Sequence, residues 1–178
     1  MTKIKIEFPK LEDAEAIQNV FYKSWLDTYP NDKVGITIDD VEHWYKDAWE
    51  EKLNKLRSRI NNPPENQSFF IAKDGDNVVG VCRIMKHADK NQLQAIYVLP
   101  DHQRRGIGKL LWDRALEIID PSKNTIVQVA TYNTKAIEFY KKLGFEDTGK
   151  RFSDEHFRMK SGAIIPEMEL EIKAQNFE

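Results

Sequence analysis

The sequence predicts an α/β fold in which a mixed central sheet is flanked by about four helices. Two kinds of hydrophobic periodicity point to this class. Segments in which apolar and polar residues alternate are typical of strands, and segments with an apolar residue every three or four positions are typical of helices. Their order is a strand, two helices, three strands and then helix–strand–helix–strand. Such an order favours a sheet that contains both parallel and antiparallel strands.

The N-terminal part supplies the first strand and two helices. Residues 4–8 alternate between apolar and charged side chains, which predicts a half-buried strand. Residues 11–25 repeat at helical spacing and predict a first helix. A loop over residues 28–37 precedes a second helix, which we expect to begin at Thr37 or Asp39 and to run as one element to about residue 60. Two consecutive prolines then stop it.

The second part of the chain alternates strands and helices. A Gly-containing turn lies between two β-rich runs and predicts a hairpin. A proline ends the following strand, and a glycine ends the last helix, as its C′ position favours. The predicted segments are strands 69–72, 78–84 and 93–99, helix 107–119, strand 125–130, helix 136–143 and a final strand 167–172.

Composition limits the function classes. The 27 basic and 29 acidic residues give a net charge of −2, which argues against a broad nucleic-acid-binding surface. No apolar run approaches the roughly 20 residues of a membrane span, and the N-terminal residues do not resemble a signal peptide. The single cysteine, Cys82, cannot form an internal disulfide, and the histidines are scattered, so we expect no metal site. These features predict one cytoplasmic domain over residues 1–178.

The turn before the 107–119 helix carries the first functional signal. It reads QRRGIGK over residues 103–109 and joins a strand to a helix. The first N–H groups of a helix lack internal partners and the helix dipole is positive there, so a phosphate group can bind. Gly106 and Gly108 allow the backbone to approach a bulky anion, and the basic side chains add charge. Leu110 and Leu111 break the patterns of a Walker loop and of a dinucleotide-binding fingerprint.

A second motif follows the next strand. Residues 133–145 read NTKAIEFYKKLGF, in which Asn133, Ala136 and Tyr140 fit the pattern Asn-x-x-Ala-x-x-x-Tyr. The preceding turn fits Gln/Arg-x-x-Gly-x-Gly/Ala. With both motifs in order, residues 93–145 resemble the GNAT superfamily of acyl-CoA-dependent N-acyltransferases, and the chain somewhat resembles its spermidine/spermine-acetylating branch. The resemblance implies a GNAT-like sheet with a splayed strand pair, acetyl-CoA as cosubstrate and a cofactor-binding core over about residues 91–145.

The resemblance gives each part of these motifs a role. The strand before the turn pairs with the pantetheine arm through its backbone, and the amide of Val98 also polarises the thioester carbonyl. The turn holds the pyrophosphate. Asn133 hydrogen-bonds the cofactor arm and can also cap its own helix. The cofactor-binding residues implied in this way are Ile96, Tyr97, Val98, Gln103, Arg104, Arg105, Gly106, Ile107, Gly108, Lys109, Asn133, Ala136 and Tyr140.

Tyr140 is the implied catalytic residue. When an amine attacks the thioester, the CoA thiolate must leave, and a positioned phenol can protonate it. The alternative is a core tyrosine with its hydroxyl at the surface. No general base is assigned, because Gln94 and Gln128 stand where many relatives carry a glutamate. Water relayed to Tyr97, His43 or a second-helix carboxylate stays open, as does direct attack by the small neutral fraction of the amine.

The acceptor is open between several classes. The leading prediction is acetyl transfer from acetyl-CoA to a primary amine by direct attack in a ternary complex, with a polyamine or another small amine as acceptor. A protein N-terminus or lysine is the runner-up, and a non-catalytic acyl-CoA-binding module is a third reading. Acidic residues early in the second helix, among them Asp39, Asp40 and Glu42, favour a cationic acceptor, although they also complement the helix dipole.

Three surface segments bear on the acceptor and on assembly. The loop around residues 30–37 and the stretch 151–166 are candidates to close over the site, which a small amine tolerates and a protein acceptor does not. The alternating strand 167–172 is expected to lie at a sheet edge, where it can pair with a second copy of the chain in a homodimer. No nucleic-acid or membrane partner is expected.

Overall fold

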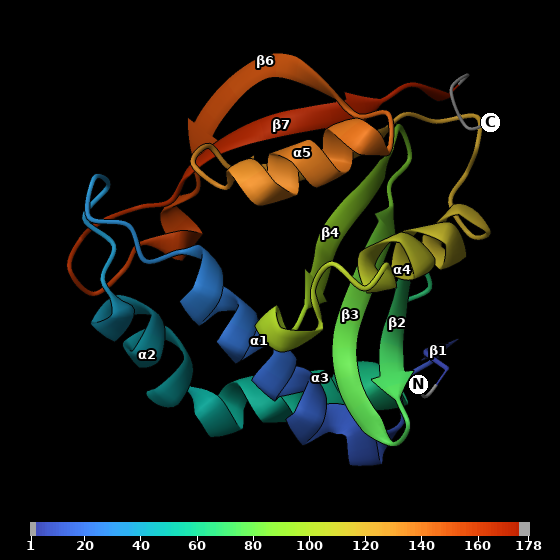
Figure 1. Ribbon diagram of the computed structural model, residues 1–178, viewed down its shortest axis with the longest axis horizontal. Coiled ribbons are helices and arrows are strands. Elements are labelled where there is room, and N and C mark those ends of the chain that lie inside the picture. The colour runs from blue at the N-terminus through green and yellow to red at the C-terminus, as the bar shows by residue number, and fades with distance from the viewer. Residues whose placement is uncertain (1–2, 175–178) are drawn as a thin grey trace.

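A seven-stranded sheet forms the centre of the computed structural model, which describes residues 3–174 (Figure 1). Its order is β1-β2-β3-β4-β5-β7-β6. Strands β4 and β5 are parallel and the other neighbours are antiparallel, so the predicted mixed α/β class is confirmed. The strands are β1 (Lys5–Glu7), β2 (Gln67–Asp74), β3 (Asn77–Lys86), β4 (Asn91–Val98), β5 (Thr125–Ala130), β6 (Glu146–Ser153) and β7 (Pro166–Ile172).

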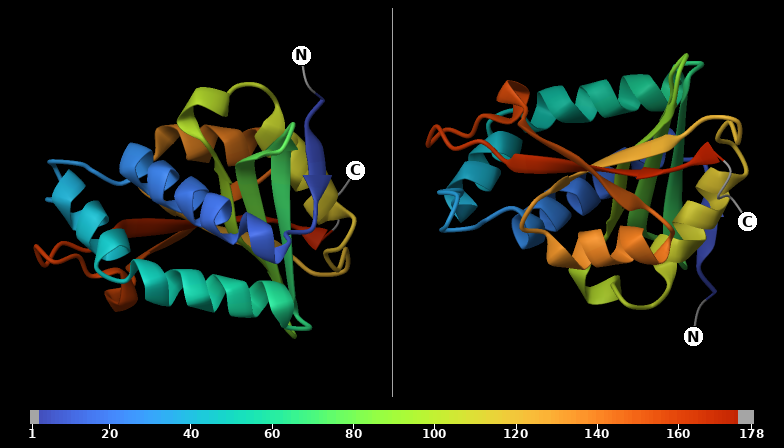
Figure 2. Two further views of the ribbon diagram at one scale, coloured as in Figure 1. Left: turned by 90° about the horizontal axis from the view of Figure 1, so that it is seen from below. Right: turned by 90° about the horizontal axis from the view of Figure 1, so that it is seen from above.

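Helices cover both faces of this sheet (Figure 2). Along β3, Cys82 and Ile84 join a core with Leu111 on one face, whereas Val81 packs with Ile17 on the other. The face with Cys82 and Ile84 is covered by α4 (Ile107–Leu116) and α5 (Thr134–Lys142), and the face with Val81 by α1 (Ala14–Thr28), α2 (Ile38–Lys46) and α3 (Trp49–Asn61). No helix among residues 3–174 is both long and apolar enough to cross a membrane.

The second helix predicted from the sequence is two helices, so its prediction as one element is wrong. The chain turns between α2 and α3 without a glycine or proline. Val41 and Tyr45 of α2 join a cluster around Trp25, whereas Leu56 and Ile60 of α3 pack against a different cluster. A straight helix cannot place its apolar side chains in both clusters, so tertiary packing breaks it.

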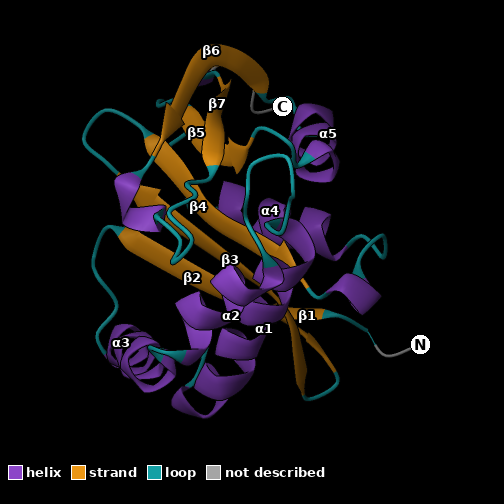
Figure 3. Ribbon diagram, turned by 90° about the vertical axis from the view of Figure 1, so that its left-hand side faces the viewer, coloured by secondary structure: helices purple, strands orange, loops and turns teal. Residues whose placement is uncertain are grey.

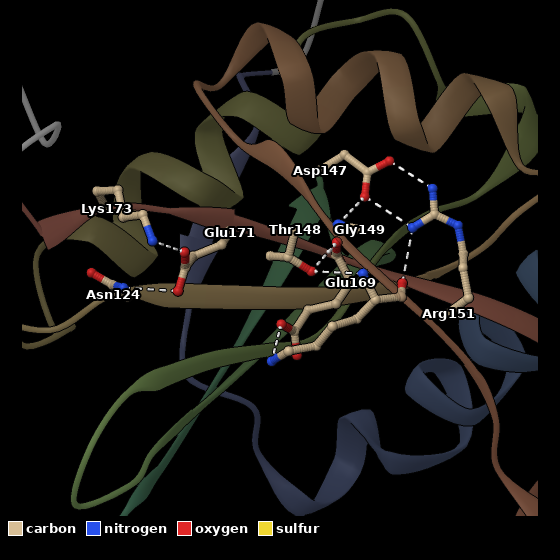
Figure 4. Close-up of polar contacts among 9 residues, drawn as sticks. Asn124, Asp147, Thr148, Gly149, Arg151, Glu169, Glu171 and Lys173 are labelled. Atoms are coloured by element: carbon tan, nitrogen blue, oxygen red, sulfur yellow. Dashed lines mark hydrogen bonds and ion pairs between the residues drawn. The ribbon is translucent and has the colours of Figure 1, made fainter.

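Strand β6 was not predicted, and it changes the place of β7. Its side chains are exposed apart from a half-buried Phe152, so it lacks the apolar alternation of a strand. Polar contacts hold it to β7 instead: Thr148 Oγ1 donates to the Glu169 carbonyl at 3.1 Å, and Lys150 Nζ lies 2.8 Å from Glu169 Oε1 (Figure 4). Because β7 lies between β5 and β6, the expectation that residues 167–172 form a sheet edge is wrong.

Strands β4 and β5 diverge after a short parallel contact. Only Asn91–Leu93 pair with Thr125–Val127. A bulge on β4 resets its side-chain alternation, because Leu93 faces Ile84 of β3 while Ala95 faces Arg83. Beyond the bulge, Ile96 packs toward the α4 side and Tyr97 toward the α1 side. The splayed strand pair is therefore confirmed, and it leaves the backbone of residues 94–98 facing a widening gap.

Candidate active site

The turn from β4 into α4 has the geometry of an anion site. The short helix Pro100–His102 follows β4, and Gln103 Nε2 donates to the Val98 carbonyl at 3.2 Å, which fixes the turn to the strand. Arg104 and Gly106 have φ values of 60° and 79°, in the left-handed region. Among residues 3–174, apart from Gly106 and its two chain neighbours, no heavy atom lies within 4 Å of where a Cβ on Gly106 would be. The first N–H groups of α4 therefore begin beside open space.

Gly108 allows two helices to pack closely, a role that the sequence did not indicate. A Cβ added to Gly108 would lie 3.2 Å from both Cε2 and Cζ of Phe139 on α5. Such a contact is tighter than ordinary van der Waals contact, so a larger residue would force the partly buried Phe139 ring, or the helix that carries it, to shift. The close approach brings the start of α4 next to the helix that carries the second motif.

The basic side chains of the turn have different surroundings. Arg105 NH2 lies 3.0 Å from Asp74 Oδ2 on β2, and Lys109 forms an ion pair with Asp113 in the next turn of α4. Arg104 is exposed. The Lys109–Asp113 pair is exposed, and such pairs contribute little to stability, so Lys109 can exchange a carboxylate for a phosphate at small cost. The Arg105 pair is less exposed, because the Asp74 side chain is largely buried.

The second motif lies on α5, at the opposite side of the gap. Asn133 caps the helix, since its Oδ1 accepts a hydrogen bond from the Ala136 amide at 3.1 Å. The capping role predicted from the sequence is confirmed. Capping uses the amide oxygen only, so Asn133 Nδ2 can still donate to a ligand.

Tyr140, the last residue of the Asn-x-x-Ala-x-x-x-Tyr pattern, lies in the core and is 6% exposed. Its ring contacts Phe145 at a centroid distance of 5.7 Å. Burial, and then the proximity of Tyr97 and Cys82, raise the pKa of Tyr140 well above its ordinary value. The phenol therefore keeps its proton throughout the neutral range, which a proton donor requires.

A chain of tyrosines that the sequence did not indicate joins α1, β4 and the β5–α5 connection. The hydroxyls of Tyr29 and Tyr97 are 3.0 Å apart, and the Tyr132 hydroxyl donates to the Tyr29 carbonyl at 2.8 Å. Burial is the main reason that the pKa values of Tyr29 and Tyr97 are raised. Only Tyr97 was among the predicted site residues, and the other two carried no motif.

A carboxylate enters the same region from β7. Glu167 is half-buried, and burial followed by the charge of Asp154 raises its pKa to about 7. By contrast, the side chains of Gln94 and Gln128 are exposed, and Gln94 Oε1 accepts a hydrogen bond from Gln67 Nε2 at 3.1 Å. The sequence placed Glu167 only in an alternating strand, where a glutamate most often faces solvent.

Two long connections cover this end of the molecule, which Figure 3 faces (residues 29–37 and 154–165). Ile36 from the first and Met159 and Ile165 from the second are buried in one cluster with Trp25 and Ala130. These covering segments therefore pack directly against the ends of α1 and β5. Figures 1 and 2 show both connections at the same end of the molecule, next to α2.

Asp40 ties the covering segments together. Its carboxylate accepts from the Thr37 amide at 2.9 Å within the cap of α2, and from both the amide and the hydroxyl of Ser161 at 2.9 Å. Burial alone would raise the pKa of Asp40, but these hydrogen bonds outweigh it and lower the pKa. Asp40 is therefore a structural residue and is not free to attract an acceptor.

Within residues 3–174, no group of three or more His, Cys, Asp or Glu side chains is placed to hold a metal ion. The groups that the structure does bring together are an anion-binding helix start, an open strand edge, a buried phenol and a half-buried carboxylate. This set suits transfer of an acyl group from a carrier that bears a phosphate.

Comparison with known proteins supports this assignment. The Acetyltransferase (GNAT) family matches residues 38–145. A Mycobacterium tuberculosis protein described as a probable N-acetyltransferase is 30% identical over 167 residues, which are 90% of this chain and 85% of the relative. A Salmonella typhimurium peptidyl-lysine N-acetyltransferase is 32% identical over 120 residues (67% and 76%). A Thermoplasma acidophilum spermidine N(1)-acetyltransferase is 29% identical over 154 residues (82% and 91%).

Solved structures agree on the fold. The PaiA N-acetyltransferase of Thermoplasma acidophilum, solved in complex with coenzyme A, superposes with a TM-score of 0.73 at 22% identity and covers 96% of this chain and 99% of its own. Fold and motifs together define an acetyl-CoA-dependent N-acetyltransferase. The chain belongs to the GNAT family of acetyltransferases.

Proposed function

We propose that the protein transfers the acetyl group of acetyl-CoA to a primary amine of a polyamine or another small amine. The amine attacks the thioester directly, with both substrates bound. The observation that carries the small-amine assignment is the covered acceptor end, where residues 29–37 and 154–165 pack onto α1 and α2. The spermidine-acetylating relative, which aligns over 82% of this chain, supports the same acceptor class.

The cover is well anchored. Trp25 stacks on Trp44 at 5.8 Å between ring centroids, and Phe157 lies 5.8 Å from Trp25. Ser161 is hydrogen-bonded to Asp40 as described above. A folded protein that presents a lysine needs an open groove along the sheet, whereas a flexible small amine can thread beneath such a cover.

Charge near the covered end favours a cationic acceptor. Asp154 is exposed in the second covering segment, and its charge reaches Glu167 on β7. A protonated amine entering beside these two carboxylates is attracted to them, and this attraction also concentrates it near the thioester. The proposal therefore keeps the cationic acceptor predicted from the sequence but moves its attraction from α2 to β7 and the 154–165 segment.

For the cosubstrate, we propose the roles that the family resemblance implied. The backbone of Ile96, Tyr97 and Val98 pairs with the pantetheine arm, residues 103–109 hold the pyrophosphate and Asn133 holds the arm from α5. Tyr140 protonates the departing thiolate. These roles rest within residues 91–145, the cofactor-binding core of a single domain.

The test is release of free CoA thiol from acetyl-CoA in the presence of polyamines, aminoglycosides, amino acids and lysine-containing peptides. We expect turnover with polyamines well above the background of hydrolysis. Turnover with lysine peptides alone would overturn the small-amine assignment. Binding of acetyl-CoA without transfer to any of these amines would overturn the proposed amine transfer itself.

A further inference from the structure

The acceptor amine needs a base that the two glutamines do not provide. A primary amine with a pKa near 10.4 is only about one part in a thousand neutral at pH 7.4. Neither Gln94 nor Gln128 can take a proton. We propose that Glu167 is the general base, and that its carboxylate accepts a proton from the acceptor ammonium before attack. This inference rests on the proposed acetylation of an amine.

Strand register places Glu167 at the wide end of the gap between β4 and β5, beyond their last paired residues. It lies opposite Ala130, the last residue of β5, and opposite Phe152 of β6. The pairing with β5 has no bulge, so alternation along β7 is regular. Met168 and Leu170 lie on the opposite face of β7 from Glu167 and Glu169, and both join the core under α4 and α5. Glu167 therefore projects from the other face, toward α1 and the covering segments.

Glu167 interacts electrostatically with titratable groups of several neighbouring elements. Its charge contributes to the raised pKa values of Tyr29 at the end of α1, Tyr97 on β4 and Tyr132 before α5. Asp154, which follows β6, acts on Glu167 itself. Tyr140 also acts on Tyr29, so the phenol and the carboxylate share one set of neighbours. A proton donor and a proton acceptor thus lie within electrostatic reach of the same point.

The other glutamates on this face of β7 already have ion-pair or hydrogen-bond partners. Glu169 is paired with Lys150 at 2.8 Å, and Glu171 accepts from Asn124 Nδ2 at 2.8 Å and pairs with Lys173 (Figure 4). The carboxylate of Glu167 has no ion-pair or hydrogen-bond partner among residues 3–174. With its pKa near 7, a large fraction of Glu167 is ionised at neutral pH and can still bind a proton.

Two of the other bases left open by the sequence, His43 and Glu42, have hydrogen-bond or ion-pair partners of their own. His43 Nδ1 lies 2.7 Å from the Asp39 carbonyl within α2. Glu42 pairs with Lys46 at 2.9 Å and accepts from the Tyr22 hydroxyl at 3.3 Å. The hydrogen bond with Lys46 lowers the pKa of Glu42 and outweighs the opposing effect of desolvation, so Glu42 is a weak base.

The proposed acetyl transfer is balanced in protons and electrons. The ammonium gives one proton to the Glu167 carboxylate, and the freed nitrogen lone pair forms the C–N bond at the thioester carbon. The C–S bond then breaks and its electron pair stays on sulfur, which takes the Tyr140 proton. The phenolate recovers a proton from the new amide nitrogen, and Glu167 releases its own to solvent. One proton is released for each acetyl group transferred.

The test compares pH profiles of kcat/KM for the acceptor in four proteins. In the wild type we expect the rate to rise with pH through about 7, because Glu167 must be ionised. Glu167→Gln should lower kcat/KM about 100-fold at pH 7.5, at the low end of what a general base contributes. It should also replace the bend near pH 7 with a continuous rise, because only the neutral fraction of the amine then reacts. Asp154→Asn should shift the rise to lower pH, because the Asp154 charge no longer raises the pKa of Glu167. Glu171→Gln, a change on the same strand face, should leave the profile unchanged.

Glu167→Asp is the control for the case in which Glu167→Gln does not fold. It keeps a carboxylate one methylene farther away, so it should keep the pH-dependent rise at a reduced rate. If Glu167→Gln folds, binds acetyl-CoA and keeps the wild-type profile within twofold, Glu167 is not the base. If the wild type acetylates no amine at all, the proposed function is refuted, and the assignment of Glu167 as the base is refuted with it.

Discussion

Replacing Asp40 with alanine removes the side chain that joins α2 to the second covering segment. Asp40 is 4% exposed and accepts hydrogen bonds from the amide and hydroxyl of Thr37 and from the amide and hydroxyl of Ser161. Asp39, its neighbour, lies in the same first turn of α2 but is exposed. The two aspartates therefore feel the same helix dipole and differ in their hydrogen bonds, which makes Asp39→Ala a matched control.

The expected loss follows from those contacts. A lost N-cap interaction costs about 1 kcal/mol, and a hydrogen bond to a charged group contributes about 1.5–3 kcal/mol. Since water can reach part of the exposed Ser161, we expect Asp40→Ala to lower the free energy of unfolding by about 2–4 kcal/mol. For a chain of this size each kcal/mol lowers the Tm by about 2–4 °C, so the Tm should fall by about 4–16 °C. Asp39→Ala should cost less than about 1 kcal/mol.

The assay is thermal and urea unfolding of both variants, with acceptor KM measured beside it. Because the folded state lowers the pKa of Asp40, its stabilisation is present above the unfolded pKa near 3.9 and is lost as pH falls through the lower folded value. The difference between the variants should therefore shrink in strong acid. Equal melting temperatures for Asp40→Ala and Asp39→Ala at neutral pH would refute this account of the cover.

Three further predictions concern the cofactor side and the core. Tyr140→Phe should lower kcat by about 10–100-fold while acetyl-CoA affinity stays within twofold, as calorimetric binding and thiol-release rates can check; an unchanged kcat would remove its acid role. Gly108→Ala should weaken CoA binding, because its Cβ would lie 3.2 Å from Phe139, and adding Phe139→Leu should restore affinity; a double variant no better than the single one would count against this steric cause. Cys82 is buried with its pKa raised to about 12 by burial, so a thiol reagent at pH 8 should label it only as fast as the protein unfolds. Rapid labelling of the native protein would contradict that burial.

Local signals were sufficient for the cofactor half of the molecule. The cap at Asn133 and the ending of α5 before Gly144, whose φ is 96°, follow from side chains and backbone freedom within a few residues. The β2–β3 hairpin turns at Gly75, whose φ is 62°, for the same reason. Neighbouring residues determine such features, so the local sequence pattern is sufficient to predict them.

Distant contacts decided the elements that were predicted wrongly or missed. The break between α2 and α3 exists because Tyr45 and Leu56 pack in different clusters. Strand β6 forms with exposed side chains because β7 offers it a free ladder of backbone groups and Glu169 offers Lys150 a partner. Neither feature has a local apolar period that a sequence could reveal.

The sequence by itself determined the α/β class and the two motifs over residues 103–109 and 133–145, because each depends on short-range spacing. Only the tertiary structure decided which side chains lie together at the proposed acceptor side. Tyr29, Tyr132 and Glu167 come from segments more than 30 residues apart and meet because β7 inserts beside β5. The surroundings of Glu167 distinguish it from the other glutamates of its strand, because burial and the charge of Asp154 raise its pKa.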